Sequence, residues 1–235
     1  MSRTLELSTR LRMVADLLPE GGCLADIGTD HAYLPSIMLM EGKIARAIAA
    51  DLRHGPLDRA RETVRSFGLQ DRVNFCLCNG LAGIAPNAPD SIAIAGMGGE
   101  TISGILQAAP WVRERDIPVV VQPMSSMPDL RQWLQDNGYC ICREELCCEG
   151  ETIYTAMLIR RGEMPAMTPA ECWAGRNENH PLRGAWLEQW LARVDRALDG
   201  LEKSRSEESS LRAGALRQVR SGLMEMKEEW DAWQR

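Results

Sequence analysis

The sequence lacks any apolar run long enough to cross a membrane. No segment of its 235 residues approaches the roughly 18 uninterrupted apolar residues that such a span needs. The first apolar run after Met1 is too short and too charged for a signal peptide. Apolar residues make up 45% and charged residues 26%, which is ordinary for a globular protein. We therefore expect a cytoplasmic protein without a membrane partner, built as one full domain plus an appendage.

Zinc-knuckle spacing is also missing, although the chain has eight cysteines. Cys76 with Cys78, and Cys140 with Cys142, form C-x-C pairs instead of C-x-x-C pairs. Both pairs fall in strand-like segments, where a period of two places both thiols on one sheet face. In a reducing cytoplasm such thiols serve as small buried hydrophobes, so we expect no metal site.

A surplus of basic residues is absent as well. The chain has 27 Lys and Arg against 33 Asp and Glu, a net charge of −6. Proteins that bind nucleic acids often carry a basic surplus, because phosphate contacts supply much of their affinity. The overall balance argues against such a partner, although charge is local and patches of arginine can act on their own.

What is present, over residues 1–162, is an alternation of strand-like and helix-like patterns. Strands are expected at 23–27, 44–50, 73–77, 91–95 and 117–121, with a terminal hairpin of 139–146 and 152–160. Helices are expected between Ser8, a candidate cap, and Pro19, then at 33–41, 56–67, from Gly99 to 108, and at 129–136. This order predicts an α/β, Rossmann-like domain with helices on both faces of the sheet.

Residues 163–235 follow a different pattern. After a polar segment with several prolines, two stretches carry apolar residues at steps of three and four. These are Leu187, Leu191, Val194, Leu198 and Leu201, then Leu216, Val219, Leu223, Met226, Trp230 and Trp233. Two such seams predict an antiparallel helical hairpin, a small coiled coil that shields its own seam.

The turn after the first expected strand departs from a dinucleotide site. G-x-G-x-x-G would continue with small residues after Gly28, but the chain has Thr29, Asp30 and His31. Carboxylates repel a pyrophosphate, whereas S-adenosylmethionine has no phosphate and carries a sulfonium and an ammonium group. Asp26 and Asp30 would attract those cations, so the turn favours S-adenosylmethionine over NAD. The alternative for Asp30 is a helix cap.

Other strand ends offer further candidates at the same edge of the sheet. Asp51 lies 23 positions after Gly28, where an acid hydrogen-bonds the ribose of an adenosine-containing cofactor. Its alternative is a cap for the helix near Pro56. Asn79 can pair with the adenine edge or serve as an ordinary turn residue before Gly80. The run from Gly96 to Gly99 permits close approach of a target atom, or forms a plain strand-to-helix turn.

Five ordered motifs carry a resemblance to a family. D-I-G-T-D-H-A-Y-L-P, A-A-D, N-G-L, A-G-M-G-G and V-V-Q-P, after an initial L-S-x-R-L, resemble the bacterial tRNA (adenine-22-N1)-methyltransferases. The resemblance covers residues 5 to about 160, and the tail is similar in type to that family's helical domain. It implies a class I methyltransferase sheet whose last strand is antiparallel. It also implies S-adenosylmethionine as methyl donor and tRNA as substrate.

The resemblance assigns roles to the residues at the strand ends. Asp26, Gly28 and Asp30 line the methionine end of the cofactor, Asp51 holds the ribose, Asn79 and Gly80 sit by the adenine, and Gly96, Met97 and Gly98 border the reaction centre. Relatives often have an acid where this chain has Asn79. We expect Asp30, His31 and Met97 to take part in catalysis. We expect Arg10, Gly98, Gly99, Gln122 and Pro123 to contact substrate.

Adenine N1 has an in-plane lone pair, so catalysis reduces to holding it in line with the methyl group. Asp30 would stabilise the positive charge that develops on the ring, and His31 would orient the base or relay a proton.

Three alternative functions stay open. They are a nicotinamide-dependent oxidoreductase, a non-catalytic scaffold, and a methyltransferase for another RNA or a small molecule. We expect a monomer, with a dimer as the alternative. The candidate phosphate contacts are Arg3, Arg10, Arg12, Arg53, Arg59 and Arg61, and in the tail Arg183, Arg193, Arg196, Arg205, Arg212, Arg217 and Arg220.

Overall fold

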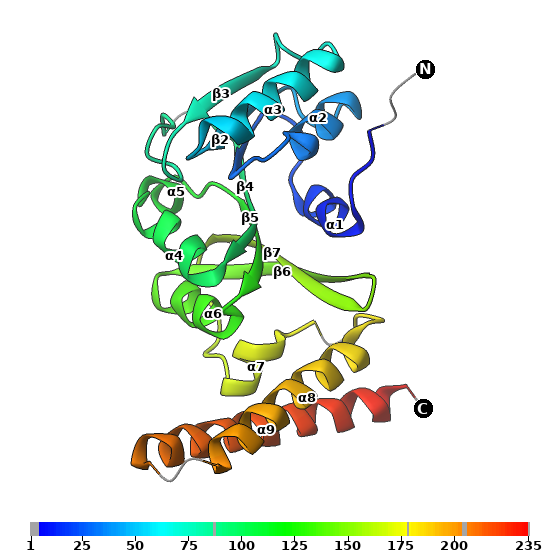
Figure 1. Ribbon diagram of the computed structural model, residues 1–235, viewed down its shortest axis with the longest axis vertical. Coiled ribbons are helices and arrows are strands. Elements are labelled where there is room, and N and C mark those ends of the chain that lie inside the picture. The colour runs from blue at the N-terminus through cyan, green and yellow to red at the C-terminus, as the bar shows by residue number, and fades with distance from the viewer. Residues whose placement is uncertain (1–4, 87, 178, 204–205, 235) are drawn as a thin grey trace.

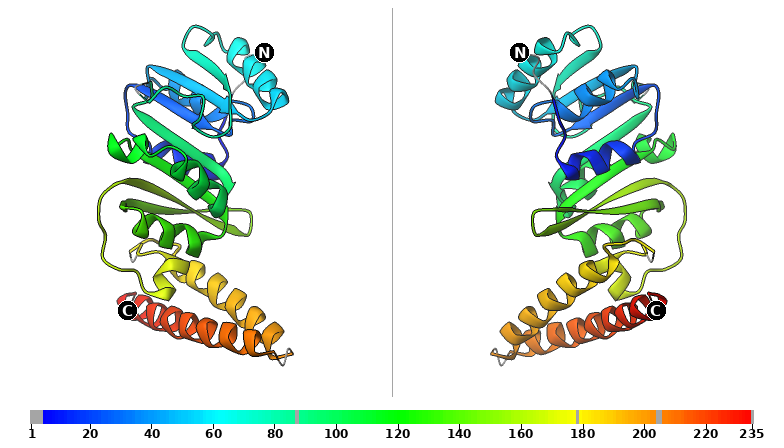
Figure 2. Two further views of the ribbon diagram at one scale, coloured as in Figure 1. Left: turned by 90° about the vertical axis from the view of Figure 1, so that its left-hand side faces the viewer. Right: turned by 90° about the vertical axis from the view of Figure 1, so that its right-hand side faces the viewer.

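The computed structural model describes residues 5–86, 88–177, 179–203 and 206–234. One seven-stranded sheet carries helices on both faces, and two long antiparallel helices lie beyond its last two strands (Figure 1). The side views in Figure 2 show the sheet between its two helical layers and the C-terminal hairpin at one end of the molecule. The predicted Rossmann-like α/β fold with a C-terminal helical hairpin is confirmed.

The sheet has the strand order β3-β2-β1-β4-β5-β7-β6. Strands β1 to β5 are parallel to one another, while β7 is antiparallel to both β5 and β6, as the resemblance implied. The outermost strands are β3 and β6, so the two C-x-C pairs lie at opposite edges. The strands are β1 (Cys23–Ile27), β2 (Arg46–Asp51), β3 (Val73–Leu77), β4 (Ser91–Gly98), β5 (Val119–Ser125), β6 (Tyr139–Glu149) and β7 (Thr152–Arg161).

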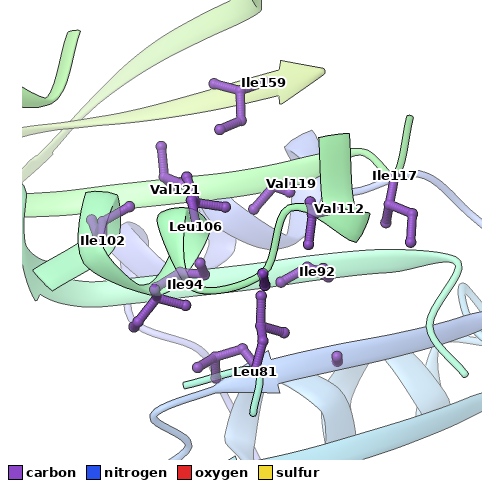
Figure 3. Close-up of a cluster of buried hydrophobic side chains, with 14 of the residues drawn as sticks. Leu81, Ile92, Ile94, Ile102, Leu106, Val112, Ile117, Val119, Val121 and Ile159 are labelled. Atoms are coloured by element: carbon purple, nitrogen blue, oxygen red, sulfur yellow. The ribbon is translucent and has the colours of Figure 1, made fainter. Parts of the chain in front are cut away.

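Alternation along the central strands divides the core into two layers. Ala25 and Ile92 face one helical layer, whereas Leu24 and Ala93 face the other, and all four are buried. Figure 3 shows the first layer, where side chains of β4 and β5 pack against α4 and α5. Strands covered on both faces explain the nearly continuous apolar runs of the sequence.

The helices divide between the two faces and the tail. They are α1 (Thr9–Leu17), α2 (Tyr33–Met40), α3 (His54–Ser66), α4 (Gly99–Gln107), α5 (Trp111–Glu114), α6 (Met127–Asp136), α7 (Pro169–Ala174), α8 (Arg183–Glu202) and α9 (Glu207–Trp233). The Ser8 cap is confirmed, because its side chain accepts from the Leu11 N–H. The sequence patterns did not predict α5 and α7, since helices of four and six residues are too short to show a periodicity.

Two strands run further than their apolar cores predict. β4 was expected to end at 95, but it continues through Gly96 to Gly98. β5 was expected to end at 121, but it continues to Ser125, so Gln122 and Pro123 lie within the strand. The pairs Met97 with Pro123 and Gly98 with Ser125 extend the ladder across two register shifts. Such irregularities occur beside active sites, where they redirect side chains.

The tail forms the predicted hairpin, but it does more than shield its own seam. Leu187, Val194 and Leu223 are buried in the seam, whereas Trp233 is 61% exposed and lies outside it. The same apolar cluster includes residues of the sheet domain, among them Leu146 of β6. The expectation of a self-contained hairpin was therefore wrong, because part of its apolar surface covers the sheet domain.

The cysteines only partly follow the expectation of buried thiols. Cys142 and Cys148 are exposed. The Cys140 and Cys142 sulfurs lie 3.5 Å apart, which confirms that a C-x-C pair shares one face. Among the described residues no three His, Cys, Asp or Glu side chains group as metal ligands. Over those same residues no helix has the length and apolarity needed to span a bilayer.

Candidate active site

The carboxyl ends of β1, β2 and β4 meet at one edge of the sheet. Ile27 pairs with Ala50 of β2 and with Ile94 of β4, so the turn after β1 begins beside the ends of β2 and the glycine-rich last residues of β4. The turn after β1 is tied down directly, because the N–H groups of Gly28 and Thr29 both donate to the Ala50 carbonyl, at 2.8 and 3.0 Å. The structure thus brings together the turn, Asp51 and the glycines of β4, as the sequence predicted.

Two buried carboxyl groups lie at this edge. Asp26 is 7% exposed and Asp51 is 9% exposed. Burial, and after it the neighbouring Asp51 carboxylate, raise the pKa of Asp26 to about 6, while a contact with the Thr29 side chain partly offsets them. Two acids that disfavour each other's charge are stabilised by a cation placed between or beside them. These two carboxyl groups therefore suit a ligand that carries positive groups and hydroxyls. They do not suit a pyrophosphate, which is itself negative.

Asp51 also organises the turn that follows it. Its Oδ1 accepts from the Arg53 N–H at 2.8 Å, and Arg53 is the N-cap residue of α3. Asp51 does not cap α3, whose N-cap residue has no side-chain cap bond, so that alternative was wrong; the bond fixes only the approach to the helix. A carboxylate has two oxygens and about four acceptor sites, so this bond leaves capacity for ribose hydroxyls.

Asp30 and His31 lie in the turn after β1, on the solvent side of this edge of the sheet. Asp30 forms an ion pair with Arg59 of α3, and its other oxygen lies 3.6 Å from His31 Nε2. The His31 ring stacks on Tyr33 at 4.9 Å, which fixes its plane. Asp30 does not cap α2: the N-cap residue is Ala32, with no side-chain cap bond, so that alternative was wrong. The carboxylate side chain is 63% exposed and accessible to a substrate.

Glycine is required at two places around Met97. Gly28 has φ of +75°, and a Cβ there would collide with the methyl group of Met97. Met97 therefore lies against the turn after β1, which is where the sequence placed a reaction-centre residue. Gly96 also has φ of +75°, a conformation that L side chains rarely adopt. The A-G-M-G-G motif thus builds a close contact between the ends of β1 and β4.

Gln122 links β5 to two other predicted site residues. Its Oε1 accepts from Arg10 Nη1 at 2.6 Å and from the Gly96 N–H at 3.1 Å. Its Nε2 donates to the Pro123 carbonyl at 2.9 Å, and the side chain is fully buried. Both polar atoms of its side chain are engaged within the protein, so Gln122 positions Arg10 and Gly96, and its contact with substrate stays a prediction.

Tyr154 of β7 is a site residue that the sequence patterns missed. The Arg10 guanidinium lies 5.8 Å from the centre of the Tyr154 ring. The Arg10 N–H also donates to Glu149 of β6, at 3.1 Å. Residues from the start of the chain and from the β6–β7 hairpin therefore border the same edge. Alternation marked Tyr154 only as a strand residue, because nothing local in the sequence indicates its neighbour Arg10.

Asn79 and the other predicted glycines, Gly80, Gly98 and Gly99, each have different surroundings. Asn79 is exposed, and its carbonyl accepts from the Ala82 N–H at 3.1 Å in an ordinary turn. A Cβ on Gly80, whose φ is +56°, would lie 2.9 Å from Ile105 of α4. A Cβ on Gly99 would collide with the Ser126 carbonyl, so packing of α4 requires this glycine. Gly98 ends β4, and a Cβ there would lie 3.0 Å from the Ser125 hydroxyl.

The candidate phosphate contacts differ in their exposure and in their partners. Arg183 was wrongly included: it is 3% exposed and donates to Ala174 O and Asn177 Oδ1, both at 2.8 Å. Arg3 and Arg205 lie outside the described residues. Arginines held by partners are Arg12 on Glu41, Arg59 on Asp30, Arg61 on the Phe75 ring, Arg193 on the Trp190 ring, and Arg220 on Asp195. Exposed ones include Arg53, Arg193, Arg196 and Arg212.

Comparisons with known proteins agree with this geometry. A family model described as a methyltransferase domain matches residues 7–157. The tRNA (adenine(22)-N(1))-methyltransferase of Bacillus subtilis is 34% identical over 162 residues, 69% of this chain and 68% of that protein. The crystal structure of the B. subtilis M1A22 tRNA methyltransferase TrmK has a TM-score of 0.85 at 27% identity, covering 95% of this chain and 100% of that one. Streptococcus pneumoniae Sp1610, solved with S-adenosyl-L-methionine, has a TM-score of 0.78 at 30% identity, covering 92% and 100%.

The strand order, the acidic edge and the matching domain model define a methyltransferase with a Rossmann-like sheet. The similarity extends beyond the sheet, because the TrmK structure covers the tail as well as the catalytic domain. The chain belongs to the family of tRNA (adenine(22)-N1)-methyltransferases.

Proposed function

We propose that the chain transfers the methyl group of S-adenosylmethionine to N1 of adenine 22 in tRNA. The observation that carries the proposal is the pair of buried acids, Asp26 and Asp51, beside the Gly28 turn. This edge suits a cationic, hydroxyl-bearing cofactor, and the relatives act on this tRNA position by name. Residues 1–162 would form the catalytic domain and 163–235 the helical domain, in a cytoplasmic, monomeric enzyme.

In this proposal the cofactor is held at three points. Asp26 and the Gly28 turn receive its methionine end, Asp51 its ribose, and Asn79 with Gly80 its adenine. The bond from the Arg53 N–H orients Asp51 before any ligand arrives. S-adenosylmethionine supplies an electrophilic methyl group when bound. Met97, which lies against Gly28, would border that group and help exclude water.

The target base would enter from the side of Asp30 and His31. Adenine N1 presents a lone pair in the ring plane, so no base needs to remove a proton before attack. As the ring becomes cationic, the exposed Asp30 carboxylate stabilises it. His31, fixed by its stack on Tyr33, would orient the base. Arg10, held by Gln122, would contact substrate together with Gly98, Gly99 and Pro123.

The proposal is tested with a bacterial tRNA transcript that carries adenine at position 22. Incubation with labelled S-adenosylmethionine should give one labelled nucleoside, 1-methyladenosine, mapped to that position. A transcript with guanine at position 22 is the matched control and should remain unlabelled. Labelling of both transcripts, or of small molecules alone, would contradict the proposal. Thermal stabilisation by S-adenosylhomocysteine, measured separately, distinguishes a wrong substrate from a missing cofactor site.

A further inference from the structure

A hollow separates the sheet domain from α8, next to the reaction edge. Its volume is about 340 Å³, and its lining includes Met124, Tyr154, Trp186, Trp190, Arg193 and Arg196. This size lies within the range of small-ligand sites, at its lower end. Tyr154 borders the catalytic edge beside Arg10, and the other five residues have no role in the catalytic arrangement proposed above. The hollow is therefore a second candidate surface for substrate, formed jointly by the two parts of the chain.

The hollow is continuous with the catalytic edge through two residues. Tyr154 lies beside the Arg10 guanidinium, which in turn is bound to Gln122. Met124 lies two positions after Gln122, and its sulfur is 3.5 Å from Gln122 Nε2. A chain of direct contacts therefore runs from Gly96 through Gln122 to the hollow. The hollow therefore adjoins the edge at which the target base would bind.

The α8 wall holds a rigid, cationic plane. The Arg193 guanidinium lies 4.9 Å over the Trp190 ring. Trp190 is itself only 5% exposed and packs edge-on against Trp173 and Trp186, at 5.1 and 5.2 Å. The exposed Arg193 side chain is thus mounted on a fixed aromatic base. A guanidinium held in this way keeps a stacking face and its donors for a ligand.

The remaining lining suits an unpaired nucleotide. Arg196, one turn further along α8, is also exposed. With two arginines against one acid, Glu151, the lining has a net positive charge. Met124 is 45% exposed on the opposite wall, near the half-buried Tyr154 ring. Proteins recognise single-stranded RNA by stacking bases on aromatic rings or arginine planes and by pairing phosphates with arginine. A peptide of acidic residues would use the arginines but not the aromatic wall.

We infer that this hollow binds a nucleotide that flanks the target adenosine, with its base between Tyr154, Met124 and the Arg193 plane. Its phosphate pairs with Arg193 and Arg196. The inference rests on the proposed function, because it takes RNA as the substrate. A base that leaves the stack to be methylated deprives its neighbour of a stacking partner. The hollow replaces that partner and so holds the distorted RNA.

The test compares the double variant Arg193→Gln/Arg196→Gln with wild type. The KM for the tRNA transcript should rise about tenfold, because two charge-assisted contacts are lost, while kcat and the Kd for S-adenosylhomocysteine stay within twofold. The matched control is Arg115→Gln, an exposed arginine at the end of α5, which should change the KM less than twofold. Circular dichroism melting confirms that each variant folds, as expected for exposed positions.

A direct binding measurement separates this inference from the proposed function. Fluorescence anisotropy of labelled pentaadenylate should show weaker binding to the double variant than to wild type and to Arg115→Gln. If this difference appears but wild type does not methylate tRNA, the subsite stands and the tRNA assignment fails. If tRNA is methylated and the double variant equals wild type in both KM and pentaadenylate binding, the inference is overturned. Equal weakening of labelled pentaglutamate would likewise overturn it, since the site would then select charge alone.

Discussion

Arg131 of α6 and Glu144 of β6 form an ion pair whose side chains are 0% and 6% exposed. Arg131 also donates to the carbonyls of Cys172 and Trp173, at 2.9 and 3.0 Å. Glu144 accepts from the Thr155 hydroxyl at 2.8 Å. The pair thus fastens the α7 segment, which leads into the hairpin, to the edge of the sheet. Arg131, held in place by Glu144, thus joins the two parts of the chain through its bonds to the α7 carbonyls.

Removing one member of this pair should be strongly destabilising. Glu144→Gln leaves the Arg131 charge buried without its counter-ion, which typically costs about 3 kcal/mol of unfolding free energy. Denaturant unfolding measures the change. The matched control is Asp116→Asn, which breaks the half-exposed pair with Arg160 and should cost under about 1 kcal/mol. Equal costs for the two variants would show that the Arg131–Glu144 pair is solvated.

Asp26 should make both stability and cofactor binding depend on pH. Its folded pKa of about 6 lies above its ordinary value of 3.8, so the native state binds the proton more tightly than the unfolded chain does. The stabilisation is present at low pH, and the unfolding free energy of the cofactor-free protein should fall by roughly 2 to 3 kcal/mol as pH rises from 4 to 6. Asp26→Asn should abolish this fall, which chemical unfolding at several pH values measures.

The same titration acts on cofactor affinity in the opposite sense. A cationic ligand favours the ionised Asp26, so binding of S-adenosylmethionine should strengthen as pH rises through 6. Calorimetric titration at pH 5 and pH 7.5 checks this, with Asp26→Asn as the variant whose affinity should show a flatter pH profile. A pH-independent affinity in wild type would remove Asp26 from contact with the charged end of the cofactor.

Asp51→Ala should weaken S-adenosylmethionine binding at least about tenfold, since hydrogen bonds to a charged acceptor are lost. Asp58→Ala, an exposed acid on α3, is the matched control and should bind normally. Asp51 also holds the Arg53 N–H, so thermal melting of each variant is needed to show that the fold persists. Unchanged affinity in a folded Asp51→Ala protein would contradict the ribose role.

Asp30→Asn should reduce turnover more than cofactor affinity. The isosteric amide keeps the size of the side chain but removes the charge that faces the developing cation. Single-turnover methylation gives the rate, and equilibrium binding of S-adenosylmethionine gives the affinity. An equal loss in both would assign Asp30 to cofactor binding. No loss in either would leave Asp30 only its ion pair with Arg59.

Local signals in the sequence predicted most of the sheet and much of the site. The buried strand β1 and the edge strand β3 have the predicted bounds, because both are short and end at turn residues. Asp51 and the Gly28 turn were found because they follow such runs directly. In contrast, β4 and β5 extend through Gly96 to Gly98 and through Gln122, since pairing between neighbours continues the strands where local propensity would end them.

Contacts between distant segments could not be predicted in this way. Tyr154 borders the site only because β7 inserts between β5 and β6 and faces Arg10 from α1. Arg183 was expected on the surface, but the α7 segment folds over it and supplies the Ala174 carbonyl. Spacing along one helix shows which residues lie off its own seam. It does not show which other element covers them.

The tail offers the last prediction. Truncation after Gly162 removes α7, α8 and α9 and with them the exposed Arg193, Arg196 and Arg212. Arginines on a stiff hairpin contact phosphates in a fixed register, so the truncated domain should methylate tRNA poorly. Its tRNA binding should also depend less steeply on salt, because fewer counterions are released. The acidic edge for the cofactor is built from β1, β2 and β4, so binding of S-adenosylmethionine should persist.

Truncation also exposes part of the sheet domain to solvent. The experiment must therefore distinguish a loss of stability from a loss of substrate contacts. Leu146 and Ile153 lose their cover, and Arg131 loses the Cys172 and Trp173 carbonyls. Truncated protein with Leu146→Thr and Ile153→Thr added is therefore the soluble form to assay, with its melting temperature and S-adenosylmethionine affinity measured first. Light scattering of the full chain tests the rival role in dimerisation. Full methylation efficiency with an unchanged salt slope in the truncated domain would show that the tail takes no part in substrate capture.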